Sequence, residues 1–200
     1  MNDSVLTEER ILDAAEEVLR RYGPAKTTVV DVARALGVSH GSVYRHFPSK
    51  VALRDAVTER WLAEVSNPLE AVAAETGPAP ERLRRWFDLL ISTKQRRALD
   101  DPELFAMYHE LAAESREVIT AHVDIIIGQL TRIITDGVAR GEFKVHDPAQ
   151  AARAAFDATV LFHKPMHASQ WSDPGIRDAF EGVWSFIMAG LGVQGADGGR

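Results

Sequence analysis

Two short runs in this sequence combine residue types that can carry out chemistry. Residues 37–41, Gly-Val-Ser-His-Gly, have the G-x-S-x-G spacing of a nucleophile elbow, in which a strained turn presents a serine for acyl transfer. His163 and His167 are four residues apart, so on a helix both imidazoles would face one side, as metal ligands do. The two runs raise two hypotheses, a hydrolase and a metal site.

The surroundings of both runs favour other functions. A nucleophile elbow needs a buried strand before the serine, whereas the preceding segment has helical periodicity and contains Arg34 and Ala35. Pro165 lies between the two histidines, and no glutamate occupies the position that a zinc-binding H-E-x-x-H helix requires. We therefore expect no catalytic residue, no enzyme activity, no cofactor and no metal. Metal binding by the histidine pair stays open as an alternative to a polar pocket or surface.

One segment near the N-terminus has the pattern of two short helices joined by a sharp turn. Thr28 and Asp31 have the spacing of a capping box, which starts the first helix. Gly37 follows this helix, where a turn needs a left-handed residue that glycine adopts at little cost. Ser39 then caps a second helix over residues 40–46. This is the helix-turn-helix pattern, whose second helix lies in the major groove of DNA.

The outward side of this helix-turn-helix carries groups that suit DNA. In the motif, the first residues of the second helix contact base edges, and flanking hydroxyl and basic groups contact phosphates. Gly41 lets the backbone approach the DNA, and Lys50 adds a charge in the first turn of the next helix. The candidate DNA-binding residues are Thr27, Thr28, Ser39, His40, Gly41, Ser42, Tyr44, Arg45, His46 and Lys50.

The run from residue 28 to residue 53 closely resembles the DNA-binding domain of the TetR family of bacterial transcriptional regulators. The residues that match in order and spacing are Thr28, Ala33, Gly37, Val38, Ser39, Tyr44, Phe47, Lys50 and Leu53. The resemblance implies an all-helical homodimer that binds a palindromic operator in double-stranded DNA. It also implies a repressor that a small-molecule effector releases. We expect a cytoplasmic regulator of this kind; the alternatives are a protein of the same fold that binds metal, or one that binds DNA and senses nothing.

Helical periodicity continues along the chain and no strand is indicated, so we expect an all-α protein of about nine helices. Asp-Pro pairs at 101–102, 147–148 and 173–174 are typical helix starts. Breaks at 66–68 and 76–78 separate a small N-terminal unit of three helices from a larger C-terminal bundle. We expect a DNA-binding domain over residues 1–50, a ligand-binding and dimerisation bundle over 51–192, and a flexible tail over 193–200.

Two sets of residues in the bundle are candidates for binding an effector or a second subunit. Aromatic, methionine and histidine side chains are typical of a ligand pocket, with plain core packing as the alternative for each. The pocket candidates are Trp86, Phe105, Tyr108, His109, Phe162, His163, Met166 and Trp171. The last two helices are rich in small and apolar residues, which favours a four-helix contact between subunits over packing within one subunit. The interface candidates are Ala155, Phe156, Ile176, Phe180, Val183, Trp184 and Ile187.

The charge of the 200-residue chain is unevenly distributed. The net charge is −6, but the first 60 residues hold nine basic and nine acidic side chains, so they are neutral. Between Arg20 and Arg54, seven basic residues stand against Asp31 alone. Phosphate attraction depends on the local charge, so the acidic total does not exclude DNA. The chain has no cysteine, which excludes thiol chemistry, and we expect no signal peptide, membrane span or membrane partner.

Overall fold

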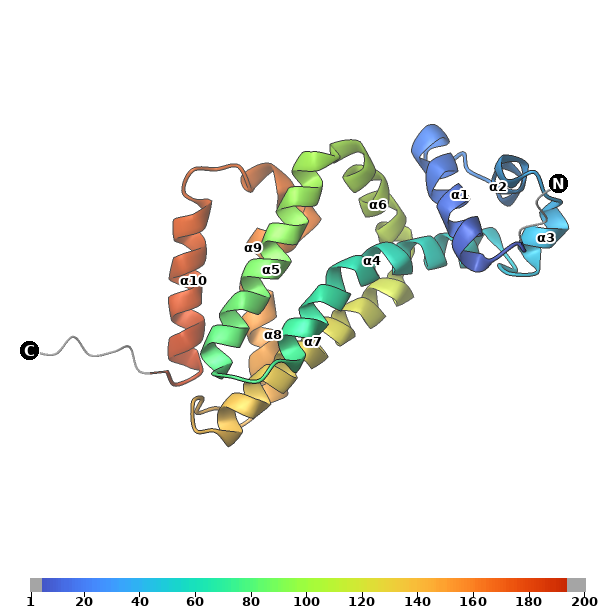
Figure 1. The fold of residues 1–200 in the computed structure, drawn as a ribbon. Helices are drawn as coiled ribbons and strands as arrows, with labels where there is room; N and C mark the ends of the chain where they lie inside the picture. The colour runs from blue at the N-terminus through green and yellow to red at the C-terminus, as the bar shows by residue number, and fades with distance from the viewer. Residues whose placement is uncertain (1–4, 194–200) are drawn as a thin grey trace, which may run out of the picture. The chain divides into compact units, whose positions relative to one another are not determined.

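The computed structural model describes residues 5–193, which form ten α-helices, one 3₁₀-helix and no strand (Figure 1). The all-α prediction is confirmed, with somewhat more helices than expected. The helices are α1 (Glu8–Tyr22), α2 (Val29–Leu36), α3 (His40–Tyr44), α4 (Lys50–Ala74), α5 (Ala79–Asp100), α6 (Pro102–Glu114), α7 (Arg116–Ala139), α8 (Pro148–Ala158), α9 (Val160–His163), η1 (Pro165–Gln170) and α10 (Ile176–Gly190). The predicted tail over 193–200 lies outside the described residues, apart from Val193.

Most helix starts follow the sequence signals. The side chains of Thr7, Asp101 and Asp147 accept hydrogen bonds from backbone N–H groups at the starts of α1, α6 and α8. The third Asp-Pro pair behaves differently, because α10 begins later, with Gly175 at its N-cap and no side-chain capping bond. Asp173 therefore does not cap this helix, and the prediction of a helix start there is wrong by two residues.

The expected break at residues 66–68 is absent, because α4 continues through Pro68. A proline inside a helix removes one backbone hydrogen bond and crowds the preceding turn. On either side of it, Val65, Leu69 and Ala73 are buried at helical spacing, so their packing keeps this part of α4 helical. The chain leaves the helix in the second predicted break, where Gly77 has a positive φ of 133°.

The described residues divide into two compact units. The head unit comprises residues 5–63 and 101–122, and the body unit comprises residues 64–100 and 123–193. Helix α6 therefore belongs to the same unit as the helix-turn-helix, although it lies far along the sequence. This division concerns packing, and the functional boundary expected at residue 50 stays a prediction.

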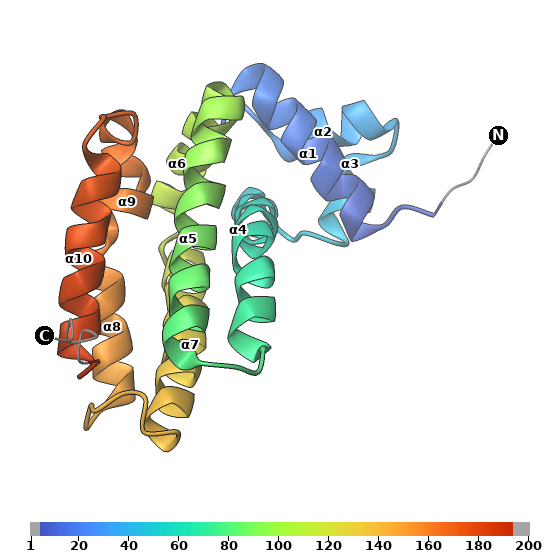
Figure 2. The ribbon, with the colours of Figure 1, turned by 60° about the vertical axis from the view of Figure 1, so that its left-hand side comes forward.

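The head unit is built on three short helices and the start of α4. Helix α1 contacts α2, and α2 contacts α3 (Figure 2). Each turns its apolar side inward, and in α3 that side is a single residue, Val43. The buried apolar side chains of this unit are Ile11, Ala15, Val18, Leu19, Val29, Val32, Ala33, Val43, Phe47, Leu53, Val57, Trp61 and Leu62, together with Phe105, Met107, Tyr108 and Leu111 of α6.

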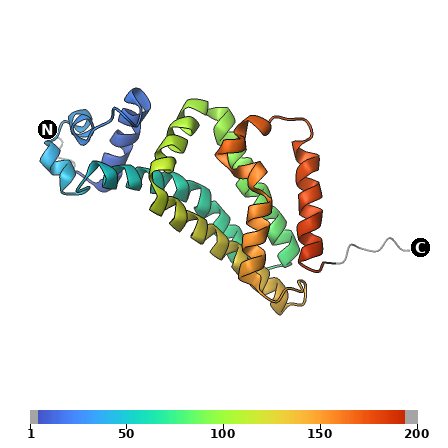
Figure 3. The ribbon, with the colours of Figure 1, turned by 180° about the vertical axis from the view of Figure 1, so that it is seen from behind.

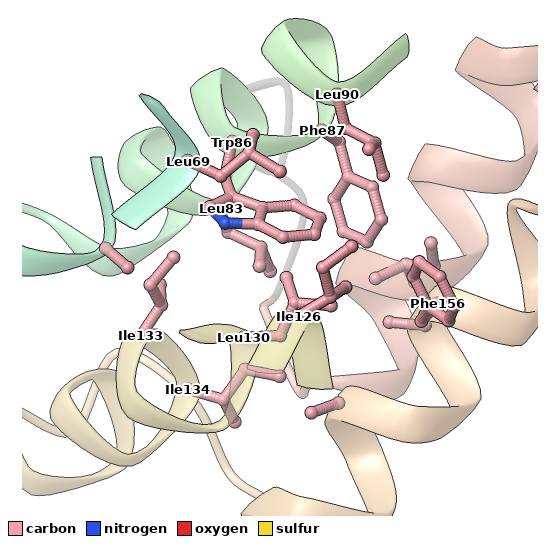
Figure 4. Close-up of a cluster of buried hydrophobic side chains, with 14 of the residues drawn as sticks. Leu69, Leu83, Trp86, Phe87, Leu90, Ile126, Leu130, Ile133, Ile134 and Phe156 are labelled. Atoms are coloured by element: carbon pink, nitrogen blue, oxygen red, sulfur yellow. The ribbon is translucent and has the colours of Figure 1, made fainter. Parts of the chain in front are cut away.

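The body unit has a larger apolar core. Its α5 side chains meet those of α7, with Phe156 from α8 beside them (Figure 4). Helices α8 and α10 both contribute to this core, and Figure 3 shows them as neighbours. Gln129 makes a polar network inside it: its Oε1 accepts from Trp86 Nε1 (3.1 Å) and its Nε2 donates to the Ser66 carbonyl (3.0 Å). The tryptophan is thus buried with its polar atom satisfied.

Helix α7 is, among the described residues, the one helix long and apolar enough to cross a membrane by length and composition alone. An 18-residue window within it has a mean hydropathy of 1.3, and 28% of that window is buried. The expected absence of a membrane span therefore stays a prediction. One such helix is weak evidence for a membrane span, since a core helix of a soluble protein passes the same test. Four of its side chains lie in the body core: Ile126, Leu130, Ile133 and Ile134.

Candidate nucleic-acid interface

A complete capping box starts α2. The Asp31 backbone N–H donates to Thr28 Oγ1 (3.3 Å), and the Thr28 backbone N–H donates to Asp31 Oδ2 (3.1 Å). The Thr28 hydroxyl also donates to Asp31 Oδ2 (2.6 Å), and this bond holds the pKa of the carboxyl below its usual value. Two of the free N–H groups at this helix end are satisfied within the motif, so the start of α2 is fixed locally.

The turn after α2 depends on Gly37, which has φ 66° and ψ 28°, in the left-handed region. Its N–H and that of Val38 bond back to carbonyls of the last turn of α2, including Ala33 (3.0 Å from the Val38 nitrogen). Ser39 then caps α3 by accepting from the Ser42 N–H (3.2 Å). Residues 37–41 therefore join two helices, and with no strand before the serine they do not form a nucleophile elbow.

The outward side of α3 is polar and accessible. His40, Gly41 and Arg45 are exposed, and Tyr44 is 42% exposed with its ring edge-on to that of His40. Ser42 is half-buried and accepts a hydrogen bond from the Arg45 guanidinium (3.3 Å). The helix ends at Tyr44, two residues earlier than expected. Polar groups on one side and a buried anchor on the other are what a helix in the major groove needs.

Two of the candidate DNA-binding residues have partners within the protein. Thr27 is buried, and its hydroxyl donates to the Gly23 carbonyl (2.9 Å), so the prediction that it donates to phosphate is wrong for this conformation. Lys50 Nζ lies 3.4 Å from the carbonyl oxygens of Pro24 and Ala25, which leaves one of its three N–H donors for another acceptor. His46 is half-buried. Thr28, Ser39 and Lys50 are exposed beside α3.

The pocket candidates do not form one group. Phe105, Tyr108 and His109 are on α6 in the head unit, whereas the other five belong to the body unit. Within the head unit, Tyr108 stacks on Trp61 with ring centroids 4.6 Å apart, and His109 points to solvent. Met166 in the body unit is 71% exposed. His109 and Met166 therefore line no interior site in this conformation.

The body-unit candidates are mostly buried with partners. Trp86 and Phe162 lie in the core, and Trp171 Nε1 donates to the Leu161 carbonyl (2.8 Å). His163 Nε2 lies 3.3 Å from Thr159 Oγ1, while His167 interacts with Gln170. Among residues 5–193, no group of three or more histidine, cysteine, aspartate or glutamate side chains is placed to hold a metal ion.

The predicted dimer-interface stripe faces the body core. Ala155, Phe156, Phe180 and Ile187 are buried within one chain, and Ile176, Val183 and Trp184 pack against the same core. Their apolar character is thus explained at least in part by packing inside the subunit, and a contact of the partly exposed Ile176, Val183 and Trp184 with a second copy stays a prediction. The exposed side of α10 carries Phe186, which is 84% exposed, a residue that the sequence reasoning missed. Small residues three, four and seven positions away, Ala189, Gly182 and Ala179, are the signal that could have found it.

Two protein-family models match the chain. The model described as "Bacterial regulatory proteins, tetR family" matches residues 11–57, which contain the helix-turn-helix. The model described as "Tetracyclin repressor-like, C-terminal domain" matches residues 79–184, more than half of the chain. This protein therefore belongs to the TetR family of bacterial regulatory proteins, as its sequence motifs predicted.

Individual proteins extend the similarity. An uncharacterized HTH-type transcriptional regulator of Mycobacterium tuberculosis is 33% identical over 103 residues, which are 52% of this chain and 49% of the relative. The match thus spans about half the length of that relative. The fatty acid metabolism regulator protein of Bacillus subtilis is 25% identical over 155 residues, 76% of this chain and 78% of the relative.

A solved structure has the same fold. SmeT, the repressor of the Stenotrophomonas maltophilia multidrug efflux pump SmeDEF, superposes with a TM-score of 0.69 and 23% identity. The superposition covers 96% of this chain and 92% of SmeT. A complex of SmeT with triclosan superposes with a TM-score of 0.68 and 21% identity, over the same shares of the two chains.

Proposed function

We propose that this protein is a transcriptional repressor that binds a palindromic operator as a homodimer and is released by a small-molecule effector. The observation that carries the proposal is the outward polar side of α3, held in place by the Gly37 turn and by Val43, which is fully buried. Membership of the TetR family and the description of its relatives as transcriptional regulators support the same function. SmeT, similar in fold, has been solved with triclosan, which supports a small molecule as effector.

In this proposal α3 reads bases and its flanks hold the DNA backbone. His40, Ser42 and Arg45 face base edges, and a guanidinium offers the paired donors that suit guanine. Tyr44 and Lys50 contact phosphates on either side, which positions the helix without reading sequence. Because Arg45 already bonds to Ser42, its guanidinium is restrained before DNA arrives, which lowers the entropy lost on binding.

We assign dimerisation to the outer side of α10. Phe186 is a large exposed apolar side chain, and the small residues around it allow another helix to approach closely. A second copy of the chain covers this side in a two-fold symmetric contact, and a two-fold dimer matches a palindromic operator. Two recognition helices then meet successive major grooves about 34–36 Å apart, or a multiple of that spacing.

We assign DNA binding to residues 1–50 and effector binding and dimerisation to residues 51–192. The effector binds more tightly to a conformation in which the two recognition helices have a spacing that does not fit the operator. It therefore lowers operator affinity, and the loss is set by the difference between its binding free energies for this conformation and for the DNA-binding one. The protein acts in the cytoplasm, where operator DNA is accessible.

Selection of binding sites from random duplex DNA tests the proposal. The purified protein should enrich a palindrome, and changes at His40 or Ser42 should alter which bases are preferred at fixed positions. Tyr44→Phe should instead weaken binding to every selected site by a similar factor, because it removes a phosphate donor. Recovery of unrelated sequences, or a uniform loss of affinity for the His40 and Ser42 variants, would overturn base reading by α3.

A further inference from the structure

The positive charge of Arg45 has no carboxylate beside it among the described residues 5–193. Other arginines of the head unit each form an ion pair with an aspartate or glutamate of the same unit, namely Arg20, Arg34, Arg54 and Arg60. The guanidinium of Arg45 instead donates to a neutral oxygen, Ser42 Oγ, at 3.3 Å. Because Arg45 is exposed, its charge and its remaining donors face a partner outside the chain.

Two serine hydroxyls support the Arg45 guanidinium. Ser39 Oγ and Ser42 Oγ lie 2.9 Å apart, and Ser39 Oγ also accepts from the Ser42 backbone N–H at 3.2 Å. A guanidinium only donates hydrogen bonds, so Ser42 Oγ is the acceptor for Arg45. The half-buried hydroxyl of Ser42 is thus engaged on two sides within α3. It is therefore better placed to hold Arg45 than to contact a base itself.

The bond to Ser42 draws the Arg45 side chain back along α3. Arg45 is the C-cap of this helix, whereas Ser42 lies in its first turn, and residues three apart are neighbours on a helix surface. The guanidinium therefore reaches the part of α3 whose side chains meet base edges when a recognition helix enters the major groove. One of its five N–H donors is used by Ser42, which leaves four for DNA.

Guanine is the base that suits these donors. In the major groove it presents two acceptors side by side, N7 and O6, and the planar fork of a guanidinium donates to both at once. Adenine offers one acceptor next to a donor, cytosine offers a donor, and thymine offers one acceptor and a methyl group. Because Ser42 restrains the fork, the guanine that it meets has a fixed position in the half-site.

We propose that Arg45 reads a guanine at one position in each half of the operator, and that Ser42 sets this choice by positioning the guanidinium. The inference rests on the proposed function, because it names the base that the outward side of α3 recognises. Arg45 contacts the base, whereas Ser42 acts through Arg45. The competing arrangement is a contact between Arg45 and phosphate, in which removal of Arg45 weakens binding to every sequence equally.

Base analogues test the contact without changing the protein. Selection from random duplexes with wild type and Arg45→Ala in parallel identifies the guanine whose preference depends on Arg45. This guanine is then replaced by 7-deazaguanine, which lacks N7 but keeps base pairing and every phosphate. In fluorescence anisotropy titrations at one salt concentration, wild type should bind the 7-deazaguanine duplex at least about fivefold more weakly. Inosine keeps N7 and O6 and lacks only the minor-groove amino group, so its duplex should bind nearly as well as the guanine duplex.

Variants assign the roles of the two side chains. Arg45→Ala should bind the guanine and 7-deazaguanine duplexes equally. Ser42→Ala should lose preference for guanine at this same position, and Ser42→Thr, which keeps the hydroxyl, should retain it. Arg34→Ala is the matched control, because it removes an exposed arginine of α2 that already pairs with Asp31. Its preference for guanine should equal that of wild type.

Each contrary result overturns a stated part of the inference. Equal binding of wild type to the guanine and 7-deazaguanine duplexes excludes base reading by Arg45. A uniform loss for Arg45→Ala with a smaller salt slope shows a phosphate contact instead. An altered preference at another position in Ser42→Ala overturns its positioning role. A selected palindrome without a guanine that depends on Arg45 overturns the inference alone, whereas failure to enrich any sequence overturns the proposed function together with it.

Discussion

Replacing Lys94 by methionine removes a buried charge and keeps an unbranched side chain of similar length. The pKa of Lys94 is about 8 in the folded chain, against an ordinary value of 10.5. A difference of about 2.5 units corresponds to about 3 kcal/mol, at about 1.36 kcal/mol per unit. The folded state loses the proton at a lower pH than the unfolded chain, so the full cost of burying the charge is present below pH 8. That cost disappears as the pH rises towards 10.5.

We therefore expect Lys94→Met to be more stable than the wild type by about 3 kcal/mol at pH 7, with this advantage lost near pH 11. Urea unfolding followed by tryptophan fluorescence, at one fixed protein concentration and at several pH values, measures the difference. Lys144→Met is the matched control, and its stability should follow that of the wild type at every pH. Equal stabilities of Lys94→Met and wild type at pH 7, with parallel pH profiles, would refute the reasoning, because Lys94 would then have kept its hydration in the folded protein.

Three other changes test the head unit, the core and the dimer. Lys50→Ala should reduce the salt dependence of operator binding, because one phosphate contact is lost. In anisotropy titrations, the slope of the logarithm of the operator binding constant against the logarithm of the salt concentration should become smaller by about 1. An unchanged slope would show that Lys50 does not contact phosphate. Gly137→Ala should destabilise the fold by about 1–3 kcal/mol in urea unfolding, because the added Cβ would lie 2.2 Å from the Phe143 ring. An unchanged midpoint of the urea unfolding transition would contradict this packing. Phe186→Glu should give a folded monomer in sedimentation velocity, and a dimer of unchanged stability would show that α10 is not the interface.

Local signals in the sequence were sufficient for the DNA-binding motif. The capping box at Thr28, the left-handed turn at Gly37 and the cap at Ser39 depend on residues a few positions apart, so their spacing predicts the geometry. Among the candidate contacts, Thr27 is buried. Its hydroxyl is used by the Gly23 carbonyl, and a side-chain bond of this kind is not visible in a pattern of hydroxyl residues.

Features that depend on long-range packing could not be predicted in the same way. An apolar stripe such as the one through Phe180 and Ile187 predicts that a helix buries one side, but not whether the partner is the same chain or a second copy. Likewise, Pro68 is a local signal for a break, and the buried residues around it keep α4 intact. Lys94 falls on the buried register of α5 with Leu83, Phe87 and Leu90, so a cation on this apolar stripe could have been found from the sequence.

The central claim is that α3 recognises a specific DNA sequence, and a comparison of two duplexes at the same salt concentration tests it most directly. One duplex carries the selected palindrome, and the other has the same base composition in scrambled order. We predict that the protein binds the palindrome at least about a thousandfold more tightly, with two chains per duplex, as specific regulators do. Equal affinity for the two duplexes would contradict the account, because it would mean that phosphate attraction alone holds this protein on DNA.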